Sequence, residues 1–264
     1  MLGNSKTIVS IDLKGVIASG ARAQLNNDAL SSMFLKLEKT KCDGISININ
    51  SPGGSPVQSS LIGSKIRSIA SKKNIKVYAF VEDVAASGGY WLACSADEIY
   101  ADNNSILGSI GVISGGFGFT GLIKKLGIER RIFTAGQNKS FLDPFSPVNK
   151  IDLNKLKKIQ KSIHYNFINW VKASRGKKIK PSNEKEIFSG SFWLSEEAKK
   201  LGLIDGIGNE SETLKLIFGE KVKIKKIKQT KSLKQKLGLG IQHDYVDTLF
   251  NKLKEEHLFS KYGL

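Results

Sequence analysis

The side chain in this sequence with the clearest potential for chemistry is the hydroxyl of Ser87, which stands between a strand-like and a helix-like segment. Residues 77–81 (VYAFV) are apolar and rich in β-branched and aromatic types, which predicts a buried strand, and residues 91–96 have a helical pattern. At such a turn a serine can present its hydroxyl at a helix N-terminus, where partial positive charge stabilises a developing anion. It can also act as an ordinary N-cap, the more common use of serine there. Both interpretations remain open on this segment alone.

A second glycine-rich turn, SPGGSP at residues 51–56, follows a strand predicted over residues 44–50 and precedes a helix over 57–71. Before them come an alternating strand at 7–13 and a helix at 27–39. This order of strand, helix, strand, helix, strand predicts a parallel sheet with right-handed crossovers. Because sites in such sheets form at the carboxyl ends of the strands, we expect both glycine turns to meet at one edge.

A serine nucleophile needs a base to take its proton and donors to hold the oxyanion. The usual base is histidine, and the chain has only His164, His243 and His257. One lies in a predicted helix and two in the C-terminal tail, so a Ser-His-Asp triad is not expected. No cluster of histidine and acidic residues has metal-ligand spacing, so we expect neither a metal nor another cofactor.

Lysine is the remaining candidate base, and position selects Lys139, on a loop after a strand predicted over residues 129–134. To act as a neutral base near pH 7, its pKa would have to fall by about 3 units from ~10.4, roughly 4 kcal/mol. Burial beside Phe141 and Phe145 would supply such a shift. The alternative is an ordinary surface lysine, and the local sequence favours that alternative.

The composition and the later part of the chain indicate the domain organisation and exclude some classes of function. The formal net charge is +17, but the lysines are scattered without arginine and aromatic clusters, so no nucleic-acid binding is expected. We expect one domain over residues 1–220, and then a basic linker and an amphipathic C-terminal helix over 221–264. Cys42 and Cys94 lack metal-ligand spacing and indicate a reduced setting. With no signal peptide and no apolar run approaching ~18 residues, the sequence predicts a cytoplasmic protein without a transmembrane helix.

Five motifs occur in a fixed order along the chain: INSPGG, AASGGYW, GSIGV, GQNKS and LGLIDGIG. Each is weak alone, but together they resemble the signal peptide peptidase A family of Ser-Lys serine proteases. The resemblance is closest to the short, single-domain bacterial form without a membrane anchor, and it extends over residues 8–219. It implies a Clp-protease/crotonase-like α/β fold, a parallel sheet with flanking helices.

The resemblance also implies roles for particular residues. Ser87 would be the nucleophile and Lys139 the general base, with Ser109 of the GSIGV motif orienting the lysine. The backbone amides of Gly54 and Gly88 would form the oxyanion hole. Glycine suits these positions because an amide can then face the substrate with no Cβ in the way.

The function implied is that of a serine endopeptidase that cleaves unfolded or signal-peptide-like peptides through an acyl-enzyme. Gly53 and Gly89 would border the bound peptide. Relatives assemble into homo-oligomeric rings in which serine and lysine come from adjacent protomers, so the site would be shared between protomers. The basic C-terminal arm would allow peripheral contact with the inner membrane. The alternatives are a crotonase-like acyl-CoA enzyme, which would not need Ser87 or Lys139, and a non-catalytic scaffold or nucleic-acid binder that exploits the charge.

Overall fold

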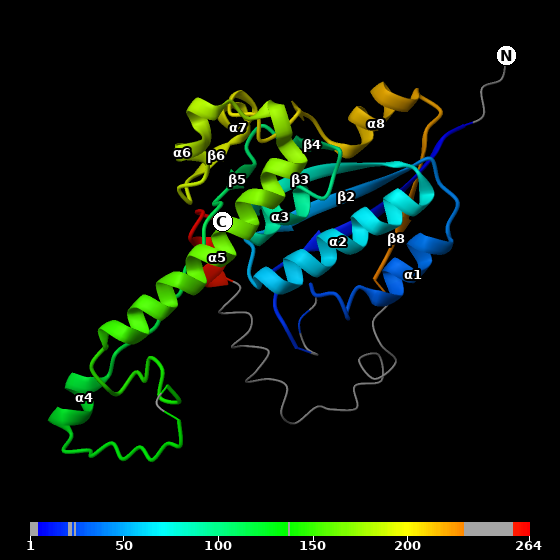
Figure 1. Cartoon of the computed structure of the whole chain (residues 1–264). Coiled ribbons are helices and arrows are strands. Elements are labelled where there is room, and N and C mark those ends of the chain that lie inside the picture. Colours follow the sequence, from blue (N-terminus) through cyan, green and yellow to red (C-terminus); the bar gives the residue numbers. More distant parts are fainter. Residues whose placement is uncertain (1–4, 21–22, 24, 137, 230–255) are drawn as a thin grey trace. The chain divides into compact units, whose positions relative to one another are not determined.

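The computed structural model describes residues 5–20, 23, 25–136, 138–229 and 256–264, which form two compact units (Figure 1). Unit 1 comprises Met1–Gly111 with Phe167–Leu264, and unit 2 comprises Val112–Asn166. Each unit is described by itself below. Most of the helix expected after the basic linker lies outside the described residues. No helix in the described ranges is both long and apolar enough to span a membrane.

Unit 1 contains a largely parallel sheet in the order β6-β5-β3-β2-β1-β8, with β4 paired to β3 and β7 paired to β4. Only the pairing of β5 with β6 is antiparallel. The strands are β1 (Thr7–Lys14), β2 (Gly44–Ser51), β3 (Lys76–Ala86), β4 (Glu98–Ala101), β5 (Ile106–Gly108), β6 (Phe192–Leu194), β7 (Gly206–Ile207) and β8 (Lys223–Ile227). The predicted fold class, a parallel α/β sheet with flanking helices, is thus confirmed.

Strand β8 corrects one expectation, because Lys223–Ile227 falls within the predicted basic linker. These residues instead pair in parallel with β1 from Thr7 to Ile11. The pairing satisfies backbone groups of β1 that would otherwise stand at an open sheet edge. Lysine is compatible with this position because an edge strand leaves its side chains in solvent; only Ile227 is buried.

Helices flank the sheet and connect its strands. They are α1 (Ser31–Lys39), α2 (Pro56–Lys73), α3 (Gly88–Ala93), α4 (Thr120–Lys125), α5 (Lys150–Arg175), α6 (Glu184–Ile187), α7 (Ser195–Lys200) and α8 (Glu210–Phe218), with 3-10 turns at Gly176–Lys178 and Pro181–Asn183. The start of α2 is fixed by its sequence, because Ser55 accepts from the Gln58 amide and Pro56 occupies the first helical position. Asn74 ends it in the left-handed conformation.

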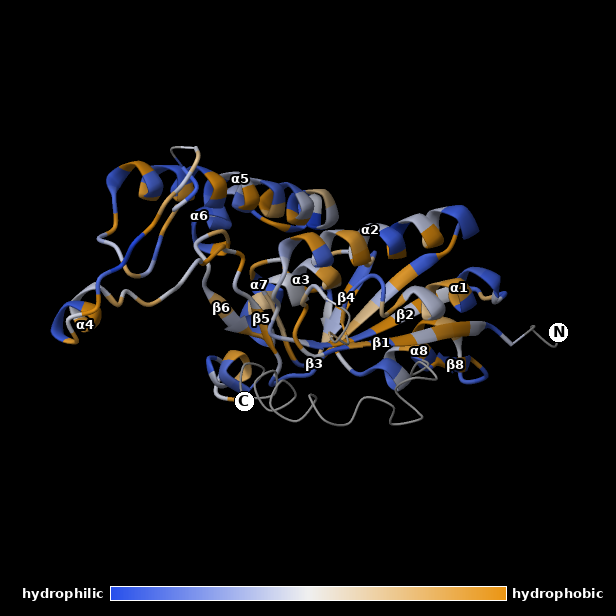
Figure 2. Cartoon of the chain, turned by 90° about the horizontal axis from the view of Figure 1, so that it is seen from below, coloured by the Kyte–Doolittle hydropathy of each residue, from blue (hydrophilic) through white to orange (hydrophobic). Residues whose placement is uncertain are grey.

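The core of unit 1 lies between the sheet and helices α1, α2 and α3, which cover one face (Figure 1). Hydrophobic residues on α1 and α2 alternate with hydrophilic ones, as expected for helices with one buried side (Figure 2), whereas every residue of α3 is buried. Trp91 of α3 stacks on Phe167 and Trp170 of α5, with ring centroids 4.9 and 5.8 Å apart. Leu214 of α8 packs on the opposite face of the sheet with Ile8.

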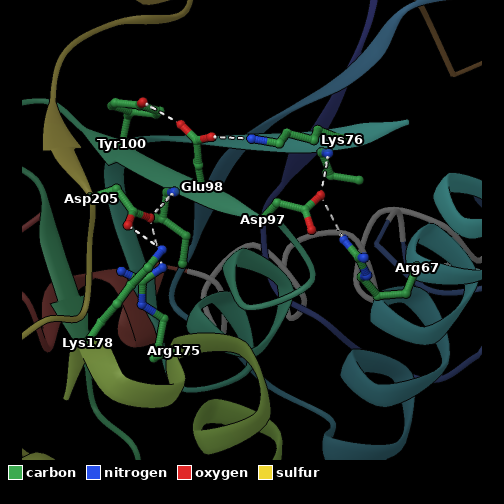
Figure 3. Close-up of polar contacts among 10 residues, drawn as sticks. Arg67, Lys76, Asp97, Glu98, Tyr100, Arg175, Lys178 and Asp205 are labelled. Atoms are coloured by element: carbon green, nitrogen blue, oxygen red, sulfur yellow. Dashed lines mark hydrogen bonds and ion pairs between the residues drawn. The ribbon is translucent and has the colours of Figure 1, made fainter. Parts of the chain in front are cut away.

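A buried ion network fixes the LGLIDGIG motif to the rest of unit 1 (Figure 3). The fully buried Arg175 donates through Nη1 to Asp205 Oδ2 at 2.8 Å and through Nε to the Gly202 carbonyl at 2.9 Å. Lys178 donates to Asp205 Oδ1 at 2.5 Å, and the Ile99 amide of β4 donates to Oδ2 at 2.8 Å. Burial by itself would raise the pKa of Asp205, but the hydrogen bonds from Arg175 and Lys178 outweigh it and hold that pKa below its ordinary value.

Replacing Asp205 by Asn should lower the free energy of unfolding by about 3 kcal/mol, because the buried guanidinium of Arg175 loses its counter-charge. Urea denaturation followed by circular dichroism measures this loss. Glu129→Gln, which breaks an exposed ion pair with Arg131, is the matched control and should leave stability close to wild type.

The same change should alter the response to acid. A carboxylate whose folded-state pKa is lowered stabilises the fold above its unfolded pKa of ~3.9, and that stabilisation disappears as pH falls through the folded value. The stability difference between wild type and Asp205→Asn should therefore shrink below about pH 4. A difference that stays constant from pH 7 to pH 2 would contradict this role of Asp205.

Candidate active site

Ser87 lies at the point where β3 ends and α3 begins, in a strained backbone conformation. Its φ of 52° and ψ of −119° are unusual for a residue other than glycine. The conformation is held from both sides, because the Ser87 amide donates to the Gly108 carbonyl at 2.8 Å and the Trp91 amide donates to the Ser87 carbonyl at 3.0 Å. Among the described residues the Ser87 hydroxyl makes no cap hydrogen bond with α3. The N-cap interpretation of this side chain is therefore wrong, and the half-buried hydroxyl is left available for other partners.

The SPGG turn follows β2, and its glycines are required by close backbone contacts. Gly53 and Gly54 have φ values of 101° and 139°, a region that side chains disfavour. The Ile17 amide donates to the Gly53 carbonyl at 2.8 Å, and the Ser55 amide donates to the Ile17 carbonyl at 2.7 Å. A Cβ on Gly54 would collide with that Ile17 carbonyl. The turn is therefore enclosed by the segment after β1, a contact that sequence reasoning missed.

The two glycine turns meet, as the strand order predicts. A Cβ placed on Gly53 would lie 2.7 Å from the Gly88 nitrogen and 2.8 Å from the Ser87 Cβ. One placed on Gly88 would lie 3.3 Å from the Gly54 nitrogen and 2.5 Å from the Ser59 Oγ. The turns are thus in backbone contact at one edge of the sheet, at Ser87.

The amides of Gly54 and Gly88 lie close together and have no acceptor among the residues that the structure describes. Neither donates a hydrogen bond to any residue within the described part of the chain. Two adjacent amides without acceptors are the arrangement that stabilises an oxyanion. Gly89 is also constrained to be glycine, because a Cβ there would collide with the Ser51 carbonyl. Sequence reasoning also missed Ser59, whose hydroxyl lies behind Gly88.

Ser109 is positioned next to these turns by the pairing of β3 with β5. Ala86 pairs with Gly108, and Ser109 follows at a φ of 50° with 7% of its surface exposed. Its amide donates to the Ser191 carbonyl at 2.6 Å. A third strand therefore ends where the two glycine turns meet. This third turn is formed by one of the five motifs that carry the family resemblance.

Lys139 belongs to unit 2 and is exposed within it, which corrects the expected burial beside Phe141 and Phe145. Those rings contact other cations, since Arg130 lies 5.1 Å from the centroid of Phe145 and Lys155 lies 5.7 Å from that of Phe141. The strand predicted over residues 129–134 is also not formed in the described part of this unit. A strand needs a partner to satisfy its backbone, and the described residues of unit 2 form no strand that could pair with it.

Comparison with known proteins identifies the family. Residues 69–223 match the model of peptidase family S49. The chain is 43% identical to an Na(+)/H(+) antiporter NhaA of Brucella melitensis over 96% of its own length, but spans only 36% of that protein. It is 30% identical to a putative protease of Synechocystis, covering 89% of this chain and 84% of the relative. A putative signal peptide peptidase SppA of Enterococcus faecium is 29% identical, with 83% and 64% covered.

Solved structures support the fold. A mutant of the 1510-N membrane-bound stomatin-specific protease, in complex with a substrate peptide, aligns with a TM-score of 0.55 at 18% identity and covers 89% of this chain and 96% of that one. A second mutant of the same protease aligns with a TM-score of 0.53 at 17% identity, over 86% and 99% of the two chains. This match confirms the predicted Clp-protease/crotonase-like architecture. The chain belongs to peptidase family S49, a family of serine peptidases.

Proposed function

We propose that the chain is a serine endopeptidase in which Ser87 and Lys139 form the catalytic dyad. The observation that carries the proposal is the pair of amides of Gly54 and Gly88, which have no acceptor among the described residues and belong to two turns in contact at Ser87. A tetrahedral intermediate needs such donors to stabilise its oxyanion. The five ordered motifs and membership of family S49 support the same assignment.

In the proposed reaction the neutral amine of Lys139 takes the proton of Ser87 as its Oγ attacks the peptide carbonyl carbon. The carbonyl oxygen becomes an oxyanion that accepts from the amides of Gly54 and Gly88. When this intermediate collapses, the C–N bond breaks and Lys139 returns the proton to the leaving amine. Lys139 then deprotonates water, which attacks the acyl carbon; the ester C–O bond breaks, the new carboxyl product leaves, and Lys139 returns the proton to Ser87 Oγ.

The proposed substrates are unfolded or signal-peptide-like peptides bordered by Gly53 and Gly89. The peptide class is supported by the solved relative, which carries a substrate peptide. We also propose that the protein acts in the cytoplasm, with peripheral contact of its basic C-terminal arm at the inner membrane. The net charge of +17 supports attraction to anionic lipid headgroups.

We propose further that the active site is completed by a second copy of the chain in a homo-oligomeric ring. Unit 2 carries Lys139 and leaves many large apolar side chains in solvent, and α4 has no buried residue. Those more than half exposed are Ile113, Phe117, Leu122, Leu126, Ile128, Phe133, Val148, Ile151 and Tyr165. So much exposed apolar surface in a small unit favours a protein partner. Burial against that partner would also supply the desolvation that Lys139 lacks within its own unit.

Alanine at Ser87 or at Lys139 should lower kcat for a reporter peptide with small apolar residues by about 10³-fold or more. Both side chains are partly or fully exposed, so thermal melting should not change. Lys125→Ala, at another lysine of unit 2, is the matched control. If Lys139→Ala cleaved the reporter peptide as fast as Lys125→Ala, Lys139 would not be the general base.

Co-expression of the Ser87→Ala and Lys139→Ala variants tests the shared site. If serine and lysine come from different copies, mixed oligomers contain some sites with both residues intact and recover a measurable fraction of wild-type turnover. Differently tagged chains allow the mixed oligomer to be purified before assay. A purified mixed oligomer without activity would show instead that each dyad lies within one chain.

A further inference from the structure

The last part of α5 is joined to α3 by an aromatic stack and by one hydrogen bond. Phe167 and Trp170 of α5 both stack on Trp91 of α3. In addition, the indole Nε1 of Trp170 donates to the Trp91 carbonyl at 2.9 Å. Trp91 is 7% exposed and Phe167 is 3% exposed, so the stack is almost free of water. The hydrogen bond fixes the Trp170 ring along α3, which stacking alone would not do.

Helix α3 depends on this partner because it is short. It has 6 residues, and the last carbonyls of any helix lack partners within it. In a longer helix the Trp91 carbonyl would pair with the Ser95 amide, but that amide donates to the Leu92 carbonyl. The Trp91 carbonyl accepts from Trp170 instead, while the Trp91 amide donates to the Ser87 carbonyl at 3.0 Å. One residue of α3 therefore connects Trp170 to the nucleophile's backbone.

The same stack contacts α2 at a glycine. A Cβ placed on Gly63 would lie 3.2 Å from the Trp170 Cζ2 and 3.5 Å from the Trp91 Cδ1. Four residues earlier, and so on the same face of α2, the Ser59 Oγ would lie 2.5 Å from a Cβ placed on Gly88. Helix α2 thus touches the first residue of α3 through Ser59 and the aromatic stack through Gly63.

These contacts bear on the two oxyanion donors, because each donor stands at the start of one of the two helices. Gly88 is the first residue of α3, and Gly54 directly precedes Ser55, the N-cap of α2. The spacing of the two amides therefore depends on how α2 and α3 pack. Donors stabilise an oxyanion only where they are held in place beforehand, and a misplacement of about 1 Å can cost about 10²-fold in rate.

We propose that Trp170 is a positioning residue of the oxyanion hole. Its N–H group holds the Trp91 carbonyl of α3, and its ring holds α3 against α2 at Gly63. The inference rests on the proposed function, in which the amides of Gly54 and Gly88 bind the oxyanion. It extends the site to a residue outside the five motifs, on a helix that begins in unit 2, the unit of Lys139.

The first test is Trp170→Phe, which keeps an aromatic ring in the stack and removes the N–H group. The rate is expressed as kcat per site that a fluorophosphonate labels at completion, so that unfolded protein does not count. This kcat should fall about tenfold while KM stays at the wild-type value, because the donors act on the transition state. Affinity for a peptide aldehyde, whose adduct with the serine carries an oxyanion, should fall by the same factor. Tyr100→Phe, which removes a hydroxyl bonded to Glu98, is the matched control and should keep full activity.

Gly63→Ala tests the contact from the side of α2. Its added Cβ would stand 3.2 Å from the Trp170 Cζ2, so the ring or the helix must move, and kcat should again fall without a change in KM. Phenylalanine at position 170 has no such atom. The double variant should therefore be no slower than Trp170→Phe alone. Additive losses in the double variant would overturn a shared role.

Hydrogen exchange without substrate separates this inference from the proposed function. In Trp170→Phe the amides of Trp91 and Cys94, which donate to the Ser87 and Tyr90 carbonyls, should exchange faster than in the wild type. Unchanged exchange, or full kcat per site in Trp170→Phe, would overturn the positioning role. If exchange rises as expected but the wild-type protein has no peptidase activity, the proposed function fails, the positioning role falls with it, and only the structural contact stands.

Discussion

Parallel pairing of β2 with β3 brings the turn at residues 51–54 against the turn at 87–89 so closely that no side-chain carbon fits between them. The rest of the site depends on this backbone contact. It requires glycine at each close approach, and it leaves beside Ser87 two amides that donate to no acceptor in the described part of the chain. A larger residue at Gly53 or Gly88 would force the turns apart and separate the donors from the hydroxyl. The glycines of these motifs are therefore required by packing. The proposed chemistry uses the two amides that this packing brings together.

The elements that hold this contact are distributed over the chain. Strand β5 holds the Ser87 amide through the Gly108 carbonyl, and the segment after β1 encloses Gly54. Farther away, the buried pair of Arg175 and Asp205 joins the end of α5 to β4, a strand that pairs directly with β3. A non-glycine residue leaves this strained conformation unless its surroundings hold it there. The positive φ of Ser87 therefore requires support from several elements.

Much of the fold could be predicted from the sequence, because short segments carry the signals for its strands and turns. The apolar run at 77–81 and the glycine turns specify strands and their ends, and parallel strands place those ends on one edge. The predictions failed where the structure depends on long-range partners. Strand β8 forms because the edge of β1 accepts it, and the environment of Lys139 is not decided by Phe141 and Phe145, which pack elsewhere. Nor could spacing have placed Tyr262, which only the folded chain brings against Val84 and Ala86 of β3.

The central claim is that Ser87 is a nucleophile activated by Lys139, and a serine-reactive fluorophosphonate probe tests it most directly. Mass spectrometry after proteolysis locates the modified residue without knowledge of the physiological substrate. The account predicts a single modification on Ser87 in the wild-type protein and its loss in the Lys139→Ala variant. Modification of a different serine, or labelling of Ser87 at an unchanged rate without Lys139, would contradict it.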